Sequence, residues 1–411
     1  MESTTTSAAV RSRSFWPLVL TGMFLIIATT GLSRVAFGAV LPYMKTGLGL
    51  SNSEAGLLGT MMFLGYLITV GLSGPLTMKW GAKKVLFIGG WGVVISLFAL
   101  ATAPSFSLAC ISILIMGGGS ALVFTPLVSI MIASFPDRRG IVLGLLLSGA
   151  GIGMFLSGIV VPLIVLHAPQ PGYRRVWLIF AIFSLLVLIA SSVVLRRVSP
   201  ANSAQAGAPQ KTNWFRNKNI LLTACLYFAV GMAYLVPLLY QTSYMIKLDF
   251  SDTIAGLCFS VSGIFGVIGG PGWGALSDRI GLRKALILSI LAAIAGNVLP
   301  VLFENLISFL ISGALLGSTI GGIATLIQAK ASHQVPQRYV SVVIGFISVF
   351  YAVGQMLGPI LAGVFIEFGG GFASAYLFGA AVYLLGLLLE VCFKPKKSEA
   401  ARKSAEANAA R

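Results

Sequence analysis

One charged residue lies well inside a long apolar segment of the chain. Arg34 follows the stretch FLIIATTGLS and precedes VAFGAVLP, in a run from Phe15 to about residue 41 that has no other charge. Burying a guanidinium among apolar groups costs a few kcal/mol or more, so this residue needs a partner. A guanidinium is a planar set of donors that binds a carboxylate through two parallel hydrogen bonds. We predict that Arg34 faces a central cavity and attracts an anion. The alternatives are that it reaches the outer membrane surface or bonds backbone carbonyls.

Polar side chains in later apolar segments are further candidates for contact with a small solute. Tyr227, Tyr234 and Gln241 are spaced by seven residues, which places them on nearly one face of a helix that Pro237 interrupts. The other candidates, of which the last two are one helical turn apart, are Tyr66, Gln328, Tyr351 and Gln355. Each has an alternative interpretation as packing, since aromatic rings fill cores and amides join neighbouring helices.

The composition indicates the elements that must position these residues. Of the 411 residues, 57% are hydrophobic and 9% are charged, and the mean hydropathy is +0.95. A soluble domain carries about 25% charged residues, so this composition excludes an ordinary soluble protein. A membrane-spanning helix needs about 20 apolar residues. We predict an all-α membrane protein with twelve transmembrane helices, at about 15–41, 53–76, 85–104, 108–134, 141–166, 176–195, 219–244, 252–277, 284–303, 306–331, 339–366 and 371–393.

The basic residues predict the orientation in the membrane. Twelve spans place both termini on one side, and with the termini inside, Lys45, Arg174, Arg175 and Lys247 are the basic residues left outside. Apart from Arg34, the other 23 lie on the inner side, which is the bias typical of cytoplasmic loops. We therefore expect a multi-pass protein of a bacterial inner (plasma) membrane with cytoplasmic termini. The net charge of +17 then favours anionic lipids at the cytoplasmic face rather than nucleic acid.

An internal repeat divides the chain into two halves. The segment GPLTMKWGAKK, from Gly74 to Lys84, recurs as GALSDRIGLRK from Gly274 to Lys284, an offset of 200 residues. Such repeats are typical of transporters whose halves move against each other. We predict a cytoplasmic tail at 1–14, a six-helix bundle at 15–195, a flexible linker rich in Ser, Ala and Pro at 196–218, a second bundle at 219–393 and a basic cytoplasmic tail at 394–411.

The second copy of this repeat resembles the cytoplasmic loop signature of the major facilitator superfamily. Its matching residues are Gly274, Asp278, Arg279 and Gly281, and the first copy keeps Gly74 and Gly81 but has Met78 at the acidic position. The segments GLSRVAFGAVLPYM and SGAGIGMFLSGIVVP are similar to the YbfB-type branch and more loosely to monocarboxylate and oxalate/formate carriers. The resemblance implies two pseudo-symmetric six-helix bundles around a central cavity, with these six loop residues acting in gating.

Together these features favour a secondary active transporter. We expect it to move a small organic anion, a carboxylate, by rocker-switch alternating access, with protons or a counter-anion as possible coupling partners, because no acidic residue lies deep in a predicted span. The alternative is an exporter of amphipathic or cationic compounds on the same fold. We expect no cofactor, no metal site and no enzymatic activity, since motifs such as HExxH, GxSxG and CxxC are absent. We also expect a monomer. Lys330 is expected to extend to the cytoplasmic surface.

Overall fold

The computed structural model describes residues 15–135, 139–167, 171–196, 217–335 and 340–392, and all regular elements in these ranges are helical. The helical segments are α1 (Phe15–Ile26), η1 (Ile27–Val35), α2 (Phe37–Leu48), α3 (Asn52–Trp80), α4 (Ala82–Thr102), α5 (Phe106–Ser134), α6 (Arg139–His167), α7 (Gly172–Arg196), α8 (Lys218–Ala233), α9 (Leu235–Lys247), α10 (Asp252–Ile280), α11 (Leu282–Leu302), α12 (Leu306–Ser332), α13 (Val340–Phe368) and α14 (Phe372–Cys392). The predicted tails lie outside the described residues, and so do residues 197–216 of the predicted linker.

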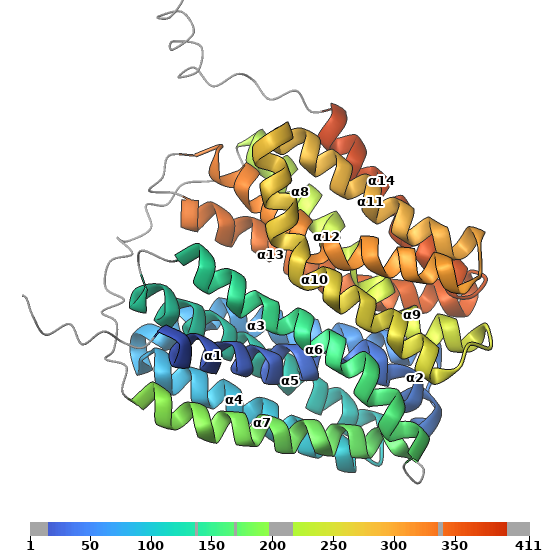
Figure 1. Cartoon of the computed structure of the whole chain (residues 1–411), viewed down its shortest axis with the longest axis horizontal. Helices are drawn as coiled ribbons and strands as arrows, with labels where there is room; N and C mark the ends of the chain where they lie inside the picture. The colour runs from blue at the N-terminus through green and yellow to red at the C-terminus, as the bar shows by residue number, and fades with distance from the viewer. Residues whose placement is uncertain (1–14, 136–138, 168–170, 197–216, 336–339, 393–411) are drawn as a thin grey trace, which may run out of the picture.

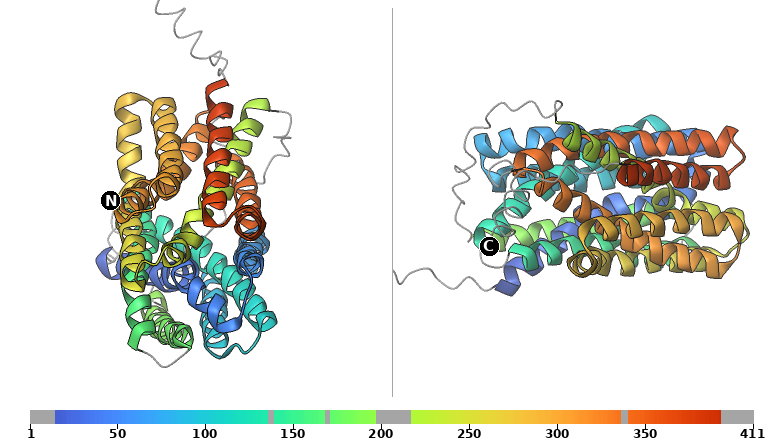
Figure 2. Two further views of the ribbon diagram at one scale, coloured as in Figure 1. Left: turned by 90° about the vertical axis from the view of Figure 1, so that its right-hand side faces the viewer. Right: turned by 90° about the horizontal axis from the view of Figure 1, so that it is seen from above.

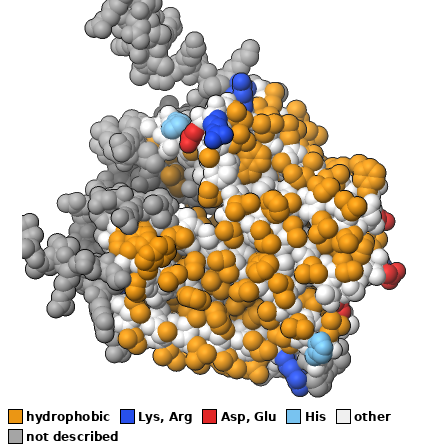
Figure 3. All heavy atoms as spheres, in the orientation of Figure 1, with side chains coloured by type: hydrophobic (Ala, Val, Ile, Leu, Met, Phe, Trp, Pro, Cys, Tyr) orange, Lys and Arg blue, Asp and Glu red, His pale blue; other side chains and the backbone are white. Residues whose placement is uncertain are grey.

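These segments form twelve spans in two bundles, as predicted. Twelve helices of the described chain are long and apolar enough to cross a membrane. Segments α1 and η1 form the first span, which α2 continues, and α8 and α9 form the seventh. The spans from α1 to α7 make one bundle and those from α8 to α14 make the other (Figure 1). The surface of both bundles is dominated by apolar side chains, as a lipid-embedded protein requires (Figure 3). The protein is therefore a multi-pass membrane protein.

The repeat predicted from the loops extends to helix ends. Ser51 caps α3 and Ser251 caps α10 through side-chain oxygens that accept backbone N–H groups. Gly81 ends α3 at φ +86° and Gly281 ends α10 at φ +90°. Residues with a Cβ rarely adopt this left-handed region, so both turns need glycine. Equivalent caps at an offset of 200 residues show that the two bundles are structural copies.

The two bundles pack tightly at the end opposite Phe15. A Cβ added to Gly256 of α10 would lie 2.1 Å from the carbonyl oxygen of Gly158 of α6. The same seam has inter-bundle hydrogen bonds from the Tyr43 hydroxyl to Asp252 (3.0 Å) and from Thr60 Oγ1 to the Met356 carbonyl oxygen (2.9 Å). Small residues here let helix backbones approach closely. We call this the closed end; α2 and α9 lie there (Figures 1 and 2).

The bundles are separated at the other end, where Phe15 lies. The four helices that form the seam, α3, α6, α10 and α13, also carry glycines toward this end. A Cβ on any of these would meet no atom within 4 Å; they are Gly71, Gly74, Gly144, Gly272, Gly274 and Gly345. The same helices are thus in contact at one end and apart at the other. We call the separated side the open end.

Candidate functional site

A π-helical segment positions Arg34. In η1 the backbone hydrogen bonds skip an extra residue, as in the 2.8 Å bond from the Ala36 N–H to the Gly31 carbonyl oxygen. Gly31 lies directly against α6, where a Cβ on it would approach the Gly153 Cα to 2.8 Å. This contact requires glycine on both helices. Segments of π-helix are rare, and those that occur often lie at functional sites. The sequence pattern did not predict this one.

The guanidinium of Arg34 lies against aromatic rings of its own bundle. Its Cζ is 4.3 Å from the ring centroid of Tyr66 and 5.4 Å from that of Phe63, both on α3. Its Nη1 donates a long hydrogen bond of 3.5 Å to the Ser120 hydroxyl of α5. Arg34 is half-buried and forms no ion pair with any residue that the structure describes. The side chain therefore does not reach a helix end, and its positive charge has no negative partner within the described protein.

The facing wall, from the second bundle, is a cluster of tyrosines and glutamines. The rings of Tyr227 and Tyr351 stack with their centroids 4.2 Å apart. The ring of Tyr234 also stacks with that of Tyr351, at a centroid distance of 5.8 Å. The Gln328 amide donates to the Tyr227 hydroxyl (3.1 Å), and the Gln355 amide donates to the Tyr234 hydroxyl. Elements α8, α12 and α13 thus bring together five predicted residues, which are hydrogen-bonded to one another or stacked.

Tyr234 lies at the boundary between the bundles, because it lines a small cavity together with Met154 of α6. Seven of the eight predicted substrate-contact residues form two groups, one in each bundle. The first group is Arg34 over Tyr66, and the second is the cluster of Tyr227, Tyr234, Gln328, Tyr351 and Gln355. They combine one unpaired cation with aromatic faces and neutral hydrogen-bonding groups, an arrangement suited to binding a small polar anion.

Gln241 lies farther along the same span, in α9, which begins one residue after Tyr234. It lines a small cavity that Tyr234 also lines. Its Oε1 accepts a 3.4 Å hydrogen bond from Ser262 of α10, and its amide nitrogen has no partner among the described residues. The predicted seven-residue stripe therefore runs from the tyrosine cluster, which contains Tyr227 and Tyr234, to the small cavity that Tyr234 and Gln241 line.

The family of the chain follows from comparison with known proteins. Residues 26–391 match the family described as "Uncharacterised MFS-type transporter YbfB". The chain belongs to this family of major facilitator superfamily transporters. The hexuronate transporter of Bacillus subtilis is 26% identical, over 95% of this chain and 98% of its own length. Monocarboxylate transporter 13 of Bos taurus is 23% identical, over 76% of this chain and 73% of its own length.

Two further comparisons concern other substrates. The multidrug resistance protein MdtG of Enterobacter lignolyticus is 31% identical but matches only 44% of each chain. The crystal structure of the nucleoside transporter NupG has a TM-score of 0.75 at 17% identity, over 92% of this chain and 100% of its own. At this identity the structural likeness bears on the fold, which is that of a major facilitator transporter.

The six predicted gating residues all lie at the open end of the transporter. Gly74 and Gly274 contact nothing across the boundary, and Gly81 and Gly281 form the positive-φ turns. Asp278 and Arg279 are exposed and have no hydrogen bond or ion pair with a described residue. Met78, at the acidic position of the first copy, is 77% exposed. Their role in gating stays a prediction, because the loops are apart in this conformation.

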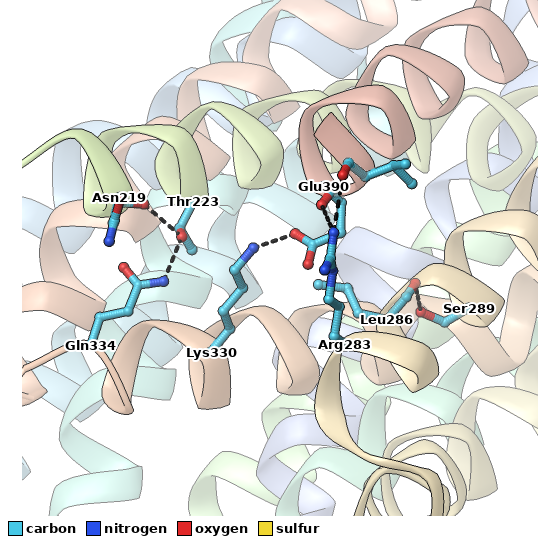
Figure 4. A network of polar contacts seen from close by, with 9 residues as sticks. Asn219, Thr223, Arg283, Leu286, Ser289, Lys330, Gln334 and Glu390 are labelled. Carbon is cyan, nitrogen blue, oxygen red and sulfur yellow. Dashed lines mark hydrogen bonds and ion pairs between the residues drawn. The ribbon is translucent and has the colours of Figure 1, made fainter. Parts of the chain in front are cut away.

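A buried ion pair at the open end was not predicted. Lys330 of α12 bonds the carboxylate of Glu390 of α14, whose side chain is 3% exposed (Figure 4). Arg283 of α11 donates to the carbonyl oxygens of Glu390 (3.3 Å) and Val391 (3.0 Å). Lys330 is 20% exposed, and the expectation that it extends to the surface did not include the bond to this buried carboxylate. No spacing rule relates residues 60 positions apart, so only the isolated Glu390 near a helix end was a signal.

Proposed function

We propose that this transporter moves a small organic anion, a carboxylate, with Arg34 as the anion-binding group. The observation that carries the proposal is the half-buried Arg34 guanidinium, which lies over the ring of Tyr66 and has no carboxylate partner among the described residues. A cation in this position is costly without a negative partner, and a substrate carboxylate would be that partner. The proposal includes hydrogen bonds to the substrate from Tyr66 and from the tyrosine and glutamine cluster.

The relatives support this class of substrate. The hexuronate and monocarboxylate transporters carry substrates whose names denote carboxylates, and the former matches nearly the whole chain. The alternative is an exporter of cationic compounds, for which MdtG is the similar protein. A cation would meet a like charge at Arg34, and like charges at about 4 Å repel by roughly 1 kcal/mol even in water and by more at lower dielectric. This contrast favours the anion.

The separated and packed ends support alternating access. Helices α3, α6, α10 and α13 have glycines toward both ends, but across the bundle boundary these glycines pack closely toward the closed end, as Gly158 does on Gly256. We propose that the opposite state closes the seam at Gly74, Gly144, Gly274 and Gly345, with Asp278, Arg279 and the turns at Gly81 and Gly281 meeting the facing bundle. With the termini cytoplasmic, as the basic residues indicate, the open end of the present conformation faces the cytoplasm. Co-transported protons or an exchanged anion would balance the charge of the carboxylate.

The experiment compares two sugars that differ in one group. Uptake of glucuronate and of glucose is measured in proteoliposomes with the parent, Arg34→Ala and Arg34→Lys, and with Arg175→Ala as a matched control at an exposed position. A charge-assisted hydrogen bond contributes about 1.5–3 kcal/mol, so Arg34→Ala should lower kcat/KM for glucuronate about 10- to 150-fold. Arg34→Lys should retain only part of the parent kcat/KM for glucuronate, since an ammonium lacks the planar pair of donors.

A parent that prefers glucose, or an Arg34→Ala variant that transports glucuronate like the Arg175→Ala control, would refute the proposal. Uptake of a lipophilic cation that improves in Arg34→Ala would instead support the exporter.

A further inference from the structure

A small cavity extends the site toward the closed end. Its walls come from both bundles and include Tyr234, Gln241 and Ser262 of the second bundle and Met154 of the first. Its volume of about 10 Å³ admits one group of the size of a water or a hydroxyl. Tyr234 borders this cavity and also belongs to the tyrosine and glutamine cluster. The cavity is therefore next to the proposed site.

The Gln241 side chain presents an unsatisfied donor to this cavity. The residue is 2% exposed, and Ser262 holds its amide by donating to Oε1 at 3.4 Å. Its Nε2 has no hydrogen-bond partner among the described residues. A buried polar group without a partner costs about 1–3 kcal/mol, so such groups call for an explanation.

The tyrosine hydroxyls next to Gln241 on the same helix are satisfied. The Tyr240 hydroxyl donates to the Pro359 carbonyl oxygen at 3.1 Å, and the Tyr244 hydroxyl donates to Glu304 at 2.9 Å. The Thr242 hydroxyl has no partner among the described residues, but Thr242 does not line the cavity. Gln241 is therefore the residue of α9 that combines a free donor with a position on the cavity wall.

We infer that Gln241, held by Ser262, is a specificity-determining residue that donates a hydrogen bond to a second oxygen of the substrate, distant from its carboxylate. This inference rests on the proposed function, since it takes the carboxylate to be at Arg34. Gln241 lies seven residues beyond Tyr234, or about 10 Å along the helix. The substrate class that fits is a carboxylic acid with a hydroxyl or carbonyl oxygen far from the acid group, such as a sugar acid. A purely aliphatic acid would leave the donor unpaired.

The experiment measures binding of two ring acids to the purified transporter by isothermal titration. Glucuronate carries ring hydroxyls, and cyclohexanecarboxylate has a similar ring and the same carboxylate without them. The variants are Gln241→Met, which keeps the side-chain length but removes the donor, and Ser262→Ala, which frees the amide to rotate. Gln334→Met is the matched control, because that glutamine bonds Thr223 at the open end instead.

The parent should bind glucuronate more tightly than cyclohexanecarboxylate. Gln241→Met should weaken the binding of glucuronate about 2- to 12-fold, which corresponds to the loss of one neutral hydrogen bond. It should leave the affinity for cyclohexanecarboxylate unchanged. Ser262→Ala should act in the same direction with a smaller effect, while Gln334→Met changes neither. The thermal midpoint of ligand-free Gln241→Met should equal or exceed that of the parent, because an unsatisfied buried donor is removed.

Two results would overturn the inference. Glucuronate binding that is unchanged in both Gln241→Met and Ser262→Ala would mean that water alone occupies the cavity. Equal weakening of both acids would mean that Gln241 supports the fold rather than specificity. Arg34→Ala distinguishes failure of the inference about Gln241 from failure of the proposed function, since on the proposed function it should weaken the binding of both acids. If Arg34→Ala alters neither acid, or the parent binds neither, the anion site itself is wrong.

Discussion

Breaking the buried ion pair at the open end should destabilise the second bundle, and the loss should depend on which partner is removed. Lys330→Met leaves the Glu390 carboxylate, which is 3% exposed, without its lysine, whereas Glu390→Gln leaves Lys330, which is 20% exposed. Losing one partner of a buried pair costs about 3–5 kcal/mol. We expect Lys330→Met to cost about 3 kcal/mol of unfolding free energy. Glu390→Gln should cost roughly half of this, because the partly exposed ammonium can turn toward water.

The double variant provides the decisive comparison. An apolar or neutral pair of similar volume is often as stable as a buried ion pair, so Lys330→Met with Glu390→Gln should lie within about 1 kcal/mol of the parent. The measurement is SDS-induced unfolding in mixed micelles for all four proteins, which completes a double-mutant cycle. If the two single effects simply add in the double variant, the Lys330–Glu390 contact is not an energetic unit and the reasoning fails. A strong dependence on salt would likewise mean that the pair is exposed, because buried pairs are little screened.

Two further substitutions test the tyrosine wall and the closed seam. Tyr351→Leu removes the ring stacked on Tyr227 and should destabilise the protein by about 0.5–1.5 kcal/mol more than Tyr351→Phe, which keeps the ring, in the same unfolding assay; equal losses would show that the hydroxyl alone matters. Gly158→Leu places a Cβ 2.3 Å from the Gly256 carbonyl oxygen, so the seam should part. In a background without the native cysteines, Thr60→Cys should then become accessible to impermeant thiol reagents. Gly144→Leu on the same helix, where a Cβ meets nothing, is the control, and identical labelling of the two would contradict the seam.

The helices were predictable because each is long and apolar. Most predicted boundaries fall within about four residues of the observed ones. The exception is the first span, which runs on to Leu48 through Pro42 as α2. The hydropathy signal weakens after residue 41, where Tyr43, Lys45 and Thr46 follow, although the helix continues to the αL turn at Gly49. Hydropathy reports the lipid-facing environment, whereas the helix end is set by this local turn.

The site was predictable in its residues but not in its contacts. The seven-residue spacing correctly grouped Tyr227 with Tyr234, since both stack with Tyr351. Gln241, seven residues farther on, lines a small cavity together with Tyr234 and bonds Ser262 instead of the tyrosine cluster. Arg34 reaches its position over Tyr66 from the π-helix of η1, in which Gly31 packs closely on Gly153. Contacts between distant helices cannot be derived from the pattern of either helix alone.

The division of chemistry between the bundles bears on how binding would drive transport. The first bundle supplies the cation, Arg34, and the second supplies neutral donors around Tyr227 and Tyr234. On the proposed function, neither wall is complete by itself: an anion on Arg34 keeps unpaired oxygens until the second wall approaches. A ligand shifts a conformational equilibrium only through contacts that differ between the states. Because the tyrosine wall belongs to the bundle that moves relative to Arg34, such a ligand favours the state in which the open end has closed around it.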